Sequence, residues 1–485
     1  MSGDPVQSND VSFRHGFAAL HSEFDYTVNA DQYRGQLPEA VRGHLFRIGP
    51  GRNALQDMPF GHWFDGDGMV HRLTFTEHGT RYQNRYVQTP KYRDETAAQS
   101  IVHRSFGHNV PGGWRYNLGK LPQNCANTNV MHFNGELLAL WEGGAPYALD
   151  PDTLETLGEQ RFDGAIKRWH AFSAHPHVDP VSGDVFNHGV AMDVRGSALH
   201  LYRLDAQGRQ RQHRRIPLKR YLFIHDSVFC GEYWVFFLHP LGLRSMLPML
   251  AGTQTLAEGI CYQPEWGMQA LIVEVKTLNV VKRVPLDPAV IIHTGNGFVE
   301  QGAIVVDVLR YADFEFAEAF KTVAVERASS ASSKAGTLYR YRFPLNHDAA
   351  MQAPIDAQAA PGDFPCWDGR YSSQPTRWLF TAAQSPQGSG DYFDCLQRTD
   401  TESGHSVQCV MGRQRFVSEP VFIPKEPWGE EGEGYLCAIV YDAGKHQSEV
   451  VIHDALDAQL KEVCAIPLRH HIPHGFHGQF YPTVS

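Results

Sequence analysis

The sequence lacks the patterns that mark membrane spans, disulfide frameworks and exported proteins. No uninterrupted run of about 18 apolar residues occurs, which argues against a helix that spans a membrane. The eight cysteines are scattered without a Cys-x-x-Cys pair, so we expect reduced thiols rather than disulfides. Residues 1–17 contain no apolar core of a secretory signal and are too acidic for a transit peptide. These absences favour a cytoplasmic protein.

The chain also has no long run of basic residues. It carries 43 Lys and Arg against 53 Asp and Glu, for a formal charge of −10, and the pI is near 6.2. This balance argues against a nucleic-acid partner. Because 42% of the 485 residues are hydrophobic and only 20% are charged, the chain can bury a sizeable core and is not disordered. The 26 histidines are the compositional excess, and they suggest metal chemistry because imidazole is the commonest metal ligand.

Helical periodicity is scarce, and what recurs instead is a β-rich run, a polar turn and a second β-rich run. Such alternation is typical of β-hairpins. The turns are spaced by 54 to 74 residues, which suits the blades of a decorated seven-bladed β-propeller, although a β-sandwich also contains many hairpins. The seven turns lie near residues 76, 150, 205, 276, 346, 400 and 454.

No linker rich in Gly, Ser or Pro divides the chain into separate domains. We therefore expect an all-β fold and one decorated propeller domain over residues 1–485. Residues 1–40 are expected to form an N-terminal extension that contributes in part to a cap.

The segment 233–250 is the most apolar part of the chain, but His239, Pro240 and Pro248 would interrupt a spanning helix. One interpretation is a core strand followed by a buried loop. The other is an exposed apolar patch within 241–250 that dips into a bilayer or borders a lipophilic entrance, which would make the protein peripheral to a membrane. The side chains of this patch would be Leu241, Leu243, Met246, Leu247, Met249 and Leu250.

Four histidines lie where an apolar run meets a turn or beside Gly or Pro, and the inner strands of a propeller could bring such distant residues together on its axis. Taken singly, each is better explained as a structural histidine, and no zinc-type spacing such as His-Glu-x-x-His occurs. Spacing alone does not separate these four from the other histidines. They are His175, His225, His293 and His477.

Several short motifs nevertheless follow one another in a familiar order. They are Arg47-Ile-Gly-Pro-Gly51, His62-Trp-Phe-Asp-Gly-Asp-Gly-Met-Val-His71, Ala126-Asn-Thr-Asn129, Leu138-Ala-Leu-Trp-Glu142, Ser173-Ala-His-Pro176, Phe223-Ile-His-Asp226, Ser418-Glu-Pro420 and His474-Gly-Phe-His477. From about Leu45 to the C-terminus the sequence resembles the carotenoid cleavage oxygenases. The resemblance implies a seven-bladed β-propeller with a cap of loops and short helices over one face.

The resemblance also implies a metal site. It assigns a non-haem Fe(II) ion to the four histidines His175, His225, His293 and His477. Carboxylates behind three of these ligands would accept the other ring N–H, which fixes the tautomer and the orientation of each ring. The matching positions are Glu142, Asp363 and Glu419.

Asp363 departs from the family, which has Glu before Phe-Pro. Its side chain is one methylene shorter, so the backbone shifts, a water bridges the gap, or the histidine is held more loosely. Two further departures, Asp226-Ser227 after His225 and Thr-Gly-Asn-Gly-Phe after His293, are expected to change the shape of the pocket. Thr128 matches a residue that crowds an open coordination position in relatives.

The implied reaction is the cleavage of a C=C bond by O2 into two carbonyl products. In stilbene-cleaving relatives a Lys precedes the Glu that is Glu142 here; this chain has Trp141, which favours an apocarotenoid or carotenoid substrate and products such as retinal. Stilbene cleavage and an inactive propeller scaffold remain the alternatives. An apolar tunnel would need aromatic walls, for which the candidates are Phe60, Trp114, Tyr311 and Phe314.

Overall fold

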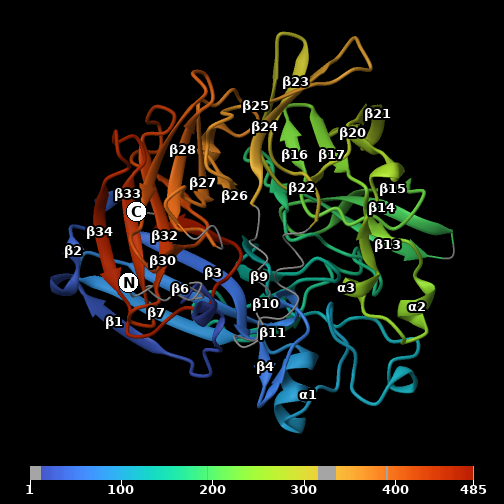
Figure 1. The fold of residues 1–485 in the computed structure, drawn as a ribbon, viewed down its shortest axis with the longest axis horizontal. Coiled ribbons are helices and arrows are strands. Elements are labelled where there is room, and N and C mark those ends of the chain that lie inside the picture. The colour runs from blue at the N-terminus through green and yellow to red at the C-terminus, as the bar shows by residue number, and fades with distance from the viewer. Residues whose placement is uncertain (1–11, 194, 315–334, 389–391, 484–485) are drawn as a thin grey trace, which may run out of the picture.

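Seven antiparallel sheets stand around one axis in the computed structural model, which describes residues 12–193, 195–314, 335–388 and 392–483. The sheets follow one another around the ring in chain order, from blue through green to red (Figure 1). This arrangement confirms the expected all-β, seven-bladed propeller and excludes the β-sandwich.

The first four blades are given from the inner to the outer strand. Blade 1 contains β35 (Gly478–Pro482), β3 (Gly43–Arg52), β6 (Asp67–Phe75), β7 (Gly79–Tyr86) and β1 (Asp25–Asn29). Blade 2 contains β8 (Asn129–Phe133), β9 (Glu136–Leu140), β10 (Tyr147–Leu149) and β11 (Thr156–Glu159). Blade 3 contains β12 (His177–Val178), β13 (Val185–Asp193), β14 (Gly196–Leu204) and β15 (Gln210–Pro217). Blade 4 contains β16 (Val228–Cys230), β17 (Tyr233–Leu238), β20 (Met268–Glu274) and β21 (Asn279–Leu286).

The remaining blades complete the ring. Blade 5 contains β22 (Val290–Glu300), β23 (Ala303–Tyr311), β24 (Thr337–Pro344) and β25 (Met351–Pro354). Blade 6 contains β26 (Gly362–Cys366), β27 (Trp378–Ala383), β28 (Cys395–Asp400) and β29 (His405–Val410). In blade 7 both β30 (Arg415–Val417) and β31 (Val421–Pro424) pair with β32 (Gly434–Asp442), which is followed by β33 (Gln447–Asp454), β34 (Glu462–Pro467) and β2 (Arg34–Gly35).

The seven hairpins expected from the sequence occupy one position in every blade. Each joins the third and fourth strands, counted from the axis, as in β6–β7 of blade 1 and β33–β34 of blade 7. The inner strands contact one another across blade boundaries, for example β16 with β22, β22 with β26, and β31 with β35. The chain therefore brings residues far apart in sequence to one central ring.

Both ends of the chain take part in closing this ring. The C-terminal strand β35 pairs with β3 on the inner side of blade 1, while β1 and β2 add outer strands to blades 1 and 7. The described part of the expected N-terminal extension thus adds a strand to the outer edge of each of two neighbouring blades. It also contains a 3₁₀ turn at Ser12–Phe17, whose aromatic rings pack near the centre of the molecule.

Apolar side chains fill the space between neighbouring blades. One buried cluster joins strands of blades 4 and 5, including Val235, Phe237, Ile304 and Val306, and other clusters join further neighbours in the same way. A strand covered on both faces needs apolar residues at successive positions, which explains the nearly continuous apolar run in β23.

Short elements lie in the connections between strands. The helix α1 (Pro90–Ala98) begins where the Thr89 side chain caps the Tyr92 N–H and proline occupies the first helical position. The other helices among the described residues are α2 (Leu247–Leu250) and α3 (Leu256–Gly259). Two-stranded ribbons are formed by β4 (Ala54–Leu55) with β5 (Met58–Pro59), and by β18 (Leu241–Leu243) with β19 (Ile260–Tyr262). The other 3₁₀ turns are Ala30–Gln32, Glu39–Val41, Trp63–Asp65, Trp114–Tyr116, Pro264–Trp266 and Gly369–Tyr371.

The segment 233–250 combines the two interpretations of its sequence. Its first part is the core strand β17, as expected. The exposed patch was wrong for Leu241, Leu243 and Met249, which are buried. The strand β18 pairs with β19, and its Leu241 and Leu243 belong to a buried cluster with Phe106 and Ile292. Leu247 and Leu250, at 74% and 37% exposure, do lie at the surface. Among the described residues, no helix is long and apolar enough to cross a membrane.

Candidate metal centre

Four histidines from four blades meet on the propeller axis. His175 precedes β12, His225 precedes β16, His293 lies within β22, and His477 precedes β35. The Nε2 atom of His225 lies 2.9 Å from that of His175 and 3.1 Å from that of His293, whose Nε2 lies 3.3 Å from that of His477. The structure therefore brings together all four histidines that the resemblance singled out.

The spacing and protonation of these rings fit a divalent cation. Two imidazole nitrogens bound at right angles, about 2.1 Å from one ion, stand about 3.0 Å apart, which matches the observed separations. Burial, followed by repulsion from His225, His477 and His293, holds the pKa of His175 well below its usual range. Burial also lowers the pKa of His477, although Glu419 opposes this. Both rings are thus neutral near pH 7 and present a lone pair.

Carboxylates hold the far sides of two rings. Asp363 Oδ1 lies 2.7 Å from His293 Nδ1, and Glu419 Oε1 lies 2.7 Å from His477 Nδ1. Burial alone would lower the pKa of His293, but the Asp363 carboxylate outweighs it and raises that pKa. These contacts fix the Nδ1–H tautomer, which leaves Nε2 free to face the centre.

The other two histidines are held less firmly. Glu142 Oε1 lies 3.3 Å from His225 Nδ1, but the angle does not make a hydrogen bond, so the contact is only electrostatic. His175 has no carboxylate within hydrogen-bond distance among the described residues; the nearest, Asp226 Oδ1, lies 3.8 Å from its Nδ1.

Asp363 reaches His293 directly despite its short side chain. The register of β26 against β27 shifts between Asp363 and Cys366, and Phe364 adopts a left-handed backbone with φ of 57°. The Phe364 N–H donates to Asp363 Oδ1 at 2.8 Å, and the Tyr311 hydroxyl donates to Oδ2. Of the three outcomes expected for the shorter residue, the structure favours a local shift of the backbone.

Arg47 is a site residue whose role sequence reasoning missed. Its Nη1 lies 2.5 Å from Glu419 Oε2 and its Nη2 donates to the Phe476 carbonyl at 3.0 Å. Burial would raise the pKa of Glu419, but His477 and Arg47 outweigh it and lower that pKa. The first motif of the resemblance contains Arg47, so its presence there was the available signal.

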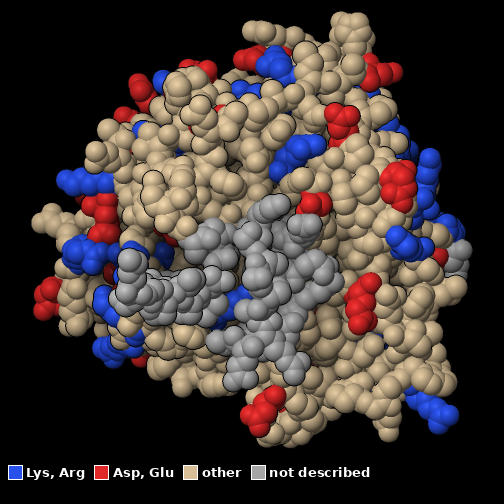
Figure 2. Space-filling view, viewed as in Figure 1, with Lys and Arg blue, Asp and Glu red and all other residues tan. Residues whose placement is uncertain are grey.

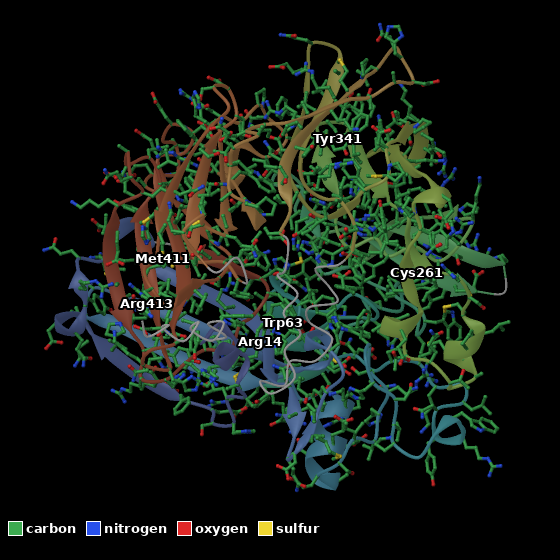
Figure 3. All side chains as sticks on the ribbon, in the orientation of Figure 1. Arg14, Trp63, Cys261, Tyr341, Met411 and Arg413 are labelled. Carbon is green, nitrogen blue, oxygen red and sulfur yellow. The ribbon has the colours of Figure 1, made fainter. Side chains whose placement is uncertain are left out.

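A narrow apolar cavity of about 150 Å³ opens on one side of the histidines. Thr128, Trp141 and Glu142 border it, as do two of the four expected aromatic residues, Tyr311 and Phe314. The expectation was wrong for Phe60, which is buried beside Leu55 and Ile101, and for Trp114, which is half exposed. Further aromatic lining comes from Trp63, Phe64, Phe106, Tyr221, Phe223, Phe364, Tyr392, Phe393 and Phe476. Of these, Trp63 is seen near the middle of the ring in Figure 3, whereas Tyr341, in the core between blades, lies further out.

A second cavity, of about 760 Å³, lies on the other side of the histidines. We call it the polar chamber, because Asp226, Ser373 and Gln374 are among the many polar residues in its wall. His293 and His477 border both cavities, His225 borders only the apolar cavity, and His175 borders only the polar chamber. The four-histidine cluster therefore separates an apolar space from a polar one.

A closed seven-bladed propeller with four axial histidines and an adjoining apolar cavity defines a distinctive class of β-propeller proteins. Comparison with known families gives the same result, since the family described as retinal pigment epithelial membrane protein (RPE65) matches residues 17–482. The chain belongs to this family, the family of the carotenoid cleavage oxygenases.

Several named relatives align over nearly the whole chain. The apocarotenoid-15,15'-oxygenase of Synechocystis sp. is 30% identical over 481 residues, which cover 96% of each chain. The carotenoid 9,10(9',10')-cleavage dioxygenase 1 of Arabidopsis thaliana is 26% identical and covers 92% of this chain and 85% of its own. The resveratrol cleavage oxygenase 1 of Aspergillus fumigatus is 26% identical, with 92% and 91% covered.

Solved structures agree with these relationships. A cobalt-substituted form of the Synechocystis apocarotenoid oxygenase superposes with a TM-score of 0.88 at 28% identity, covering 97% of this chain and 98% of the other. A Glu-to-Asp variant of the same oxygenase gives a TM-score of 0.89 at 28% identity, covering 98% of this chain and all of the other.

Proposed function

We propose that this protein is a non-haem Fe(II) dioxygenase that cleaves one C=C bond of an apocarotenoid or carotenoid with O2. The observation that carries this proposal is the aromatic, apolar cavity that ends on a cluster of four imidazoles. The relatives named as apocarotenoid and carotenoid oxygenases support C=C cleavage, which removes the inactive scaffold from consideration.

The ion is assigned to His175, His225, His293 and His477. Four neutral imidazoles leave its charge uncompensated, and the carboxylates Asp363 and Glu419 supply negative charge next to two of them. A ferrous ion bound there would supply the activation of O2. Binding of cobalt by the Synechocystis relative supports a divalent cation at this position.

The reaction balances without an outside reductant. Both atoms of O2 end as the oxygens of two carbonyl products, and the C=C bond supplies the electrons. No side chain needs to act as a general acid or base. The chain contributes the position of the polyene and a space from which water is excluded, for which aromatic walls such as Phe223 and Phe476 are suited.

The charge in the cavity favours a polyene over a phenolic stilbene. Among the described residues that line the apolar cavity, none is Lys or Arg, so a phenolate would have no cationic partner there. Trp141 stands in the cavity wall where the stilbene-cleaving branch is expected to have Lys. The apocarotenoid-15,15'-oxygenase relative favours retinal as a product.

We further propose that the enzyme is cytoplasmic and collects its lipophilic substrate at a membrane surface. The loop with Trp114 and Leu118 lies against α2, because the Gly119 N–H donates to the Leu250 carbonyl at 2.8 Å. These side chains and Leu247 are exposed and apolar, while Leu256, a few residues further along the chain, lines the apolar cavity. Exposed Arg115, Lys120 and Arg244 nearby suit anionic lipid headgroups.

A parallel substrate assay tests the proposed function. Iron-loaded protein is incubated in air with a β-apocarotenal, β-carotene or resveratrol, and the products are identified by mass. Retinal-sized aldehydes from the first two support the proposal, and hydroxybenzaldehydes from resveratrol alone would overturn it. His293→Ala is the matched negative control, and it is expected to lose both bound iron and product formation.

A further inference from the structure

We propose that the polar chamber is the path by which the ferrous ion reaches the four histidines, and that Asp226 is the carboxylate that receives the ion there. This inference rests on the proposed function, because it concerns the delivery of the same ion. It assigns separate routes to two ligands of opposite polarity: the apolar polyene enters through the apolar cavity, and the hydrated cation enters through the polar chamber.

The physical reason for two routes is desolvation. A divalent ion that passes through an aromatic space must lose its hydration before any ligand replaces it, which costs far more than passage along polar walls. The wall of the polar chamber offers such groups, including the hydroxyls of Ser372 and Ser373 and the amide of Gln374. Ser372 and Gln374 are exposed residues, which places this part of the chamber wall at the protein surface.

The charge of the chamber wall favours a cation. Its carboxylates are Asp179, Asp226 and Glu419, against the guanidinium of Arg370, which is paired with Asp368 at 2.5 Å. Glu419 is balanced by Arg47. In the part of the chain that the structure describes, no Lys or Arg lies within ion-pair distance of Asp226, so its negative charge is not balanced by a basic side chain.

Asp226 is held firmly beside His175, the one axial histidine that borders the polar chamber alone. Its Oδ2 accepts from the Thr294 N–H at 2.7 Å and from the Thr294 hydroxyl at 2.8 Å, while Oδ1 lies 3.8 Å from His175 Nδ1. His175 borders only the polar chamber, and at 14% its side chain is the most exposed of the four histidines. No carboxylate of the described residues accepts a hydrogen bond from this ring, which leaves it able to adjust when the ion arrives.

The experiment measures metal entry rather than catalysis. Metal-free protein is prepared with a chelator under anaerobic conditions, Co²⁺ is added, and the rise of the cobalt absorption band gives the loading rate. Gly369→Trp is designed to obstruct the chamber: Gly369 lines it, and a Cβ added there meets no atom within 4 Å, so the substitution introduces no clash at its first atom. Gly369→Ala is the matched control, and Leu256→Trp obstructs the apolar cavity instead.

We expect Gly369→Trp to load Co²⁺ at least tenfold more slowly than Gly369→Ala, with the same final stoichiometry and, once loaded with iron, the same kcat. Leu256→Trp should load at the wild-type rate while its KM for the polyene rises. Asp226→Asn should load more slowly and with a weaker dependence on ionic strength than the wild type, and Asp226→Glu should restore both.

Equal loading rates for Gly369→Trp and Gly369→Ala would overturn the proposal, as would slow loading in Leu256→Trp. A failure of the proposed metal site has a different signature, because wild-type protein would then bind no Co²⁺ at any rate or would bind it without His293, and the substrate assay tests the proposed function separately. Thermal unfolding of each metal-free variant identifies any that fails to fold, and the Gly369 pair does not depend on the outcome for Asp226.

Discussion

Asp363 carries the most informative departure from the family pattern. A carboxylate one methylene shorter still reaches His293 because β26 shifts its register and the Tyr311 hydroxyl occupies the second oxygen. The substitution was visible in the sequence, but its compensation was not, since Tyr311 belongs to another blade. A contact between residues 52 positions apart follows from the closed ring rather than from local pattern.

Removing this carboxylate tests its role in holding the ligand. We expect Asp363→Ala to retain metal about 10- to 100-fold less tightly, because His293 loses the partner that fixes its tautomer and orientation. Competition with a metal-sensitive dye measures the affinity. Asp363→Glu is the matched control and should retain more metal than the alanine variant; equal affinities in wild type and Asp363→Ala would remove this residue from the centre.

Arg47 illustrates a buried charge that depends on its partner. Arg47→Ala leaves the largely buried Glu419 carboxylate without its guanidinium, so we expect the free energy of unfolding to fall by about 3–5 kcal/mol. Urea denaturation of the metal-free protein measures the change. The exposed pair of Arg34 and Glu462 is the control, for which Arg34→Ala should cost no more than about 1 kcal/mol. A comparable loss at both sites would contradict the argument.

At the scale of elements, alternation and turn residues were sufficient to locate one hairpin in every blade. Each hairpin joins the third and fourth strands of its blade, which are neighbours in sequence, so it can be recognised from a short contiguous segment. The inner strands near the histidines are short or irregular: β12 has two residues, β16 has three, and the register of β22 shifts on both sides of Thr294. Their place depends on contacts with other blades, which is why periodicity alone did not separate the four axial histidines from the rest.

The segment around α2 is a second case in which long-range contacts decide what the local sequence pattern could not. Its hydrophobicity indicated either a core or a surface patch, and it is divided between the two, because β18 pairs with β19 in the interior while Leu247 and Leu250 of α2 are exposed. The exposed side chains Trp114 and Leu118, whose loop contacts α2, lie more than 120 residues earlier in the chain, and no pattern within 241–250 predicts this contact.

This surface leads to a prediction about membranes. We expect Leu247→Asp to reduce sedimentation with anionic phospholipid vesicles severalfold, because it places a charge in the apolar contact. Since Leu247 is 74% exposed, the free energy of unfolding should change by no more than about 0.5 kcal/mol. Leu157→Asp, at an exposed position on the outer strand of blade 2, is the control and should sediment as the wild type does. Equal loss of binding in both variants would indicate a general charge effect.

At the scale of the whole molecule, the ring is closed by non-covalent pairing of β35 with β3. His477 immediately precedes this closing strand, and the other three histidines precede or lie in the inner strands of blades 3, 4 and 5. On the face seen in Figure 2, acidic and basic side chains are interspersed rather than gathered into one charged patch. We therefore expect the ring to be stabilised by apolar packing between blades and by the metal ion bound at the four histidines.

We infer that the chain is one domain whose stability is coupled to its centre, and metal loading tests this. An ion held by four blades binds only the closed ring, so at about 100 times its dissociation constant it should add about 2.7 kcal/mol to the free energy of unfolding. Differential scanning calorimetry should then show one transition that moves up by several degrees on addition of Co²⁺. His477→Ala should abolish this shift, whereas His213→Ala, in the outer histidine group formed with His170 and His200, should preserve it. Two separate transitions, or an equal shift in His477→Ala, would contradict the coupling, because the ion would then be bound without joining the ends of the ring.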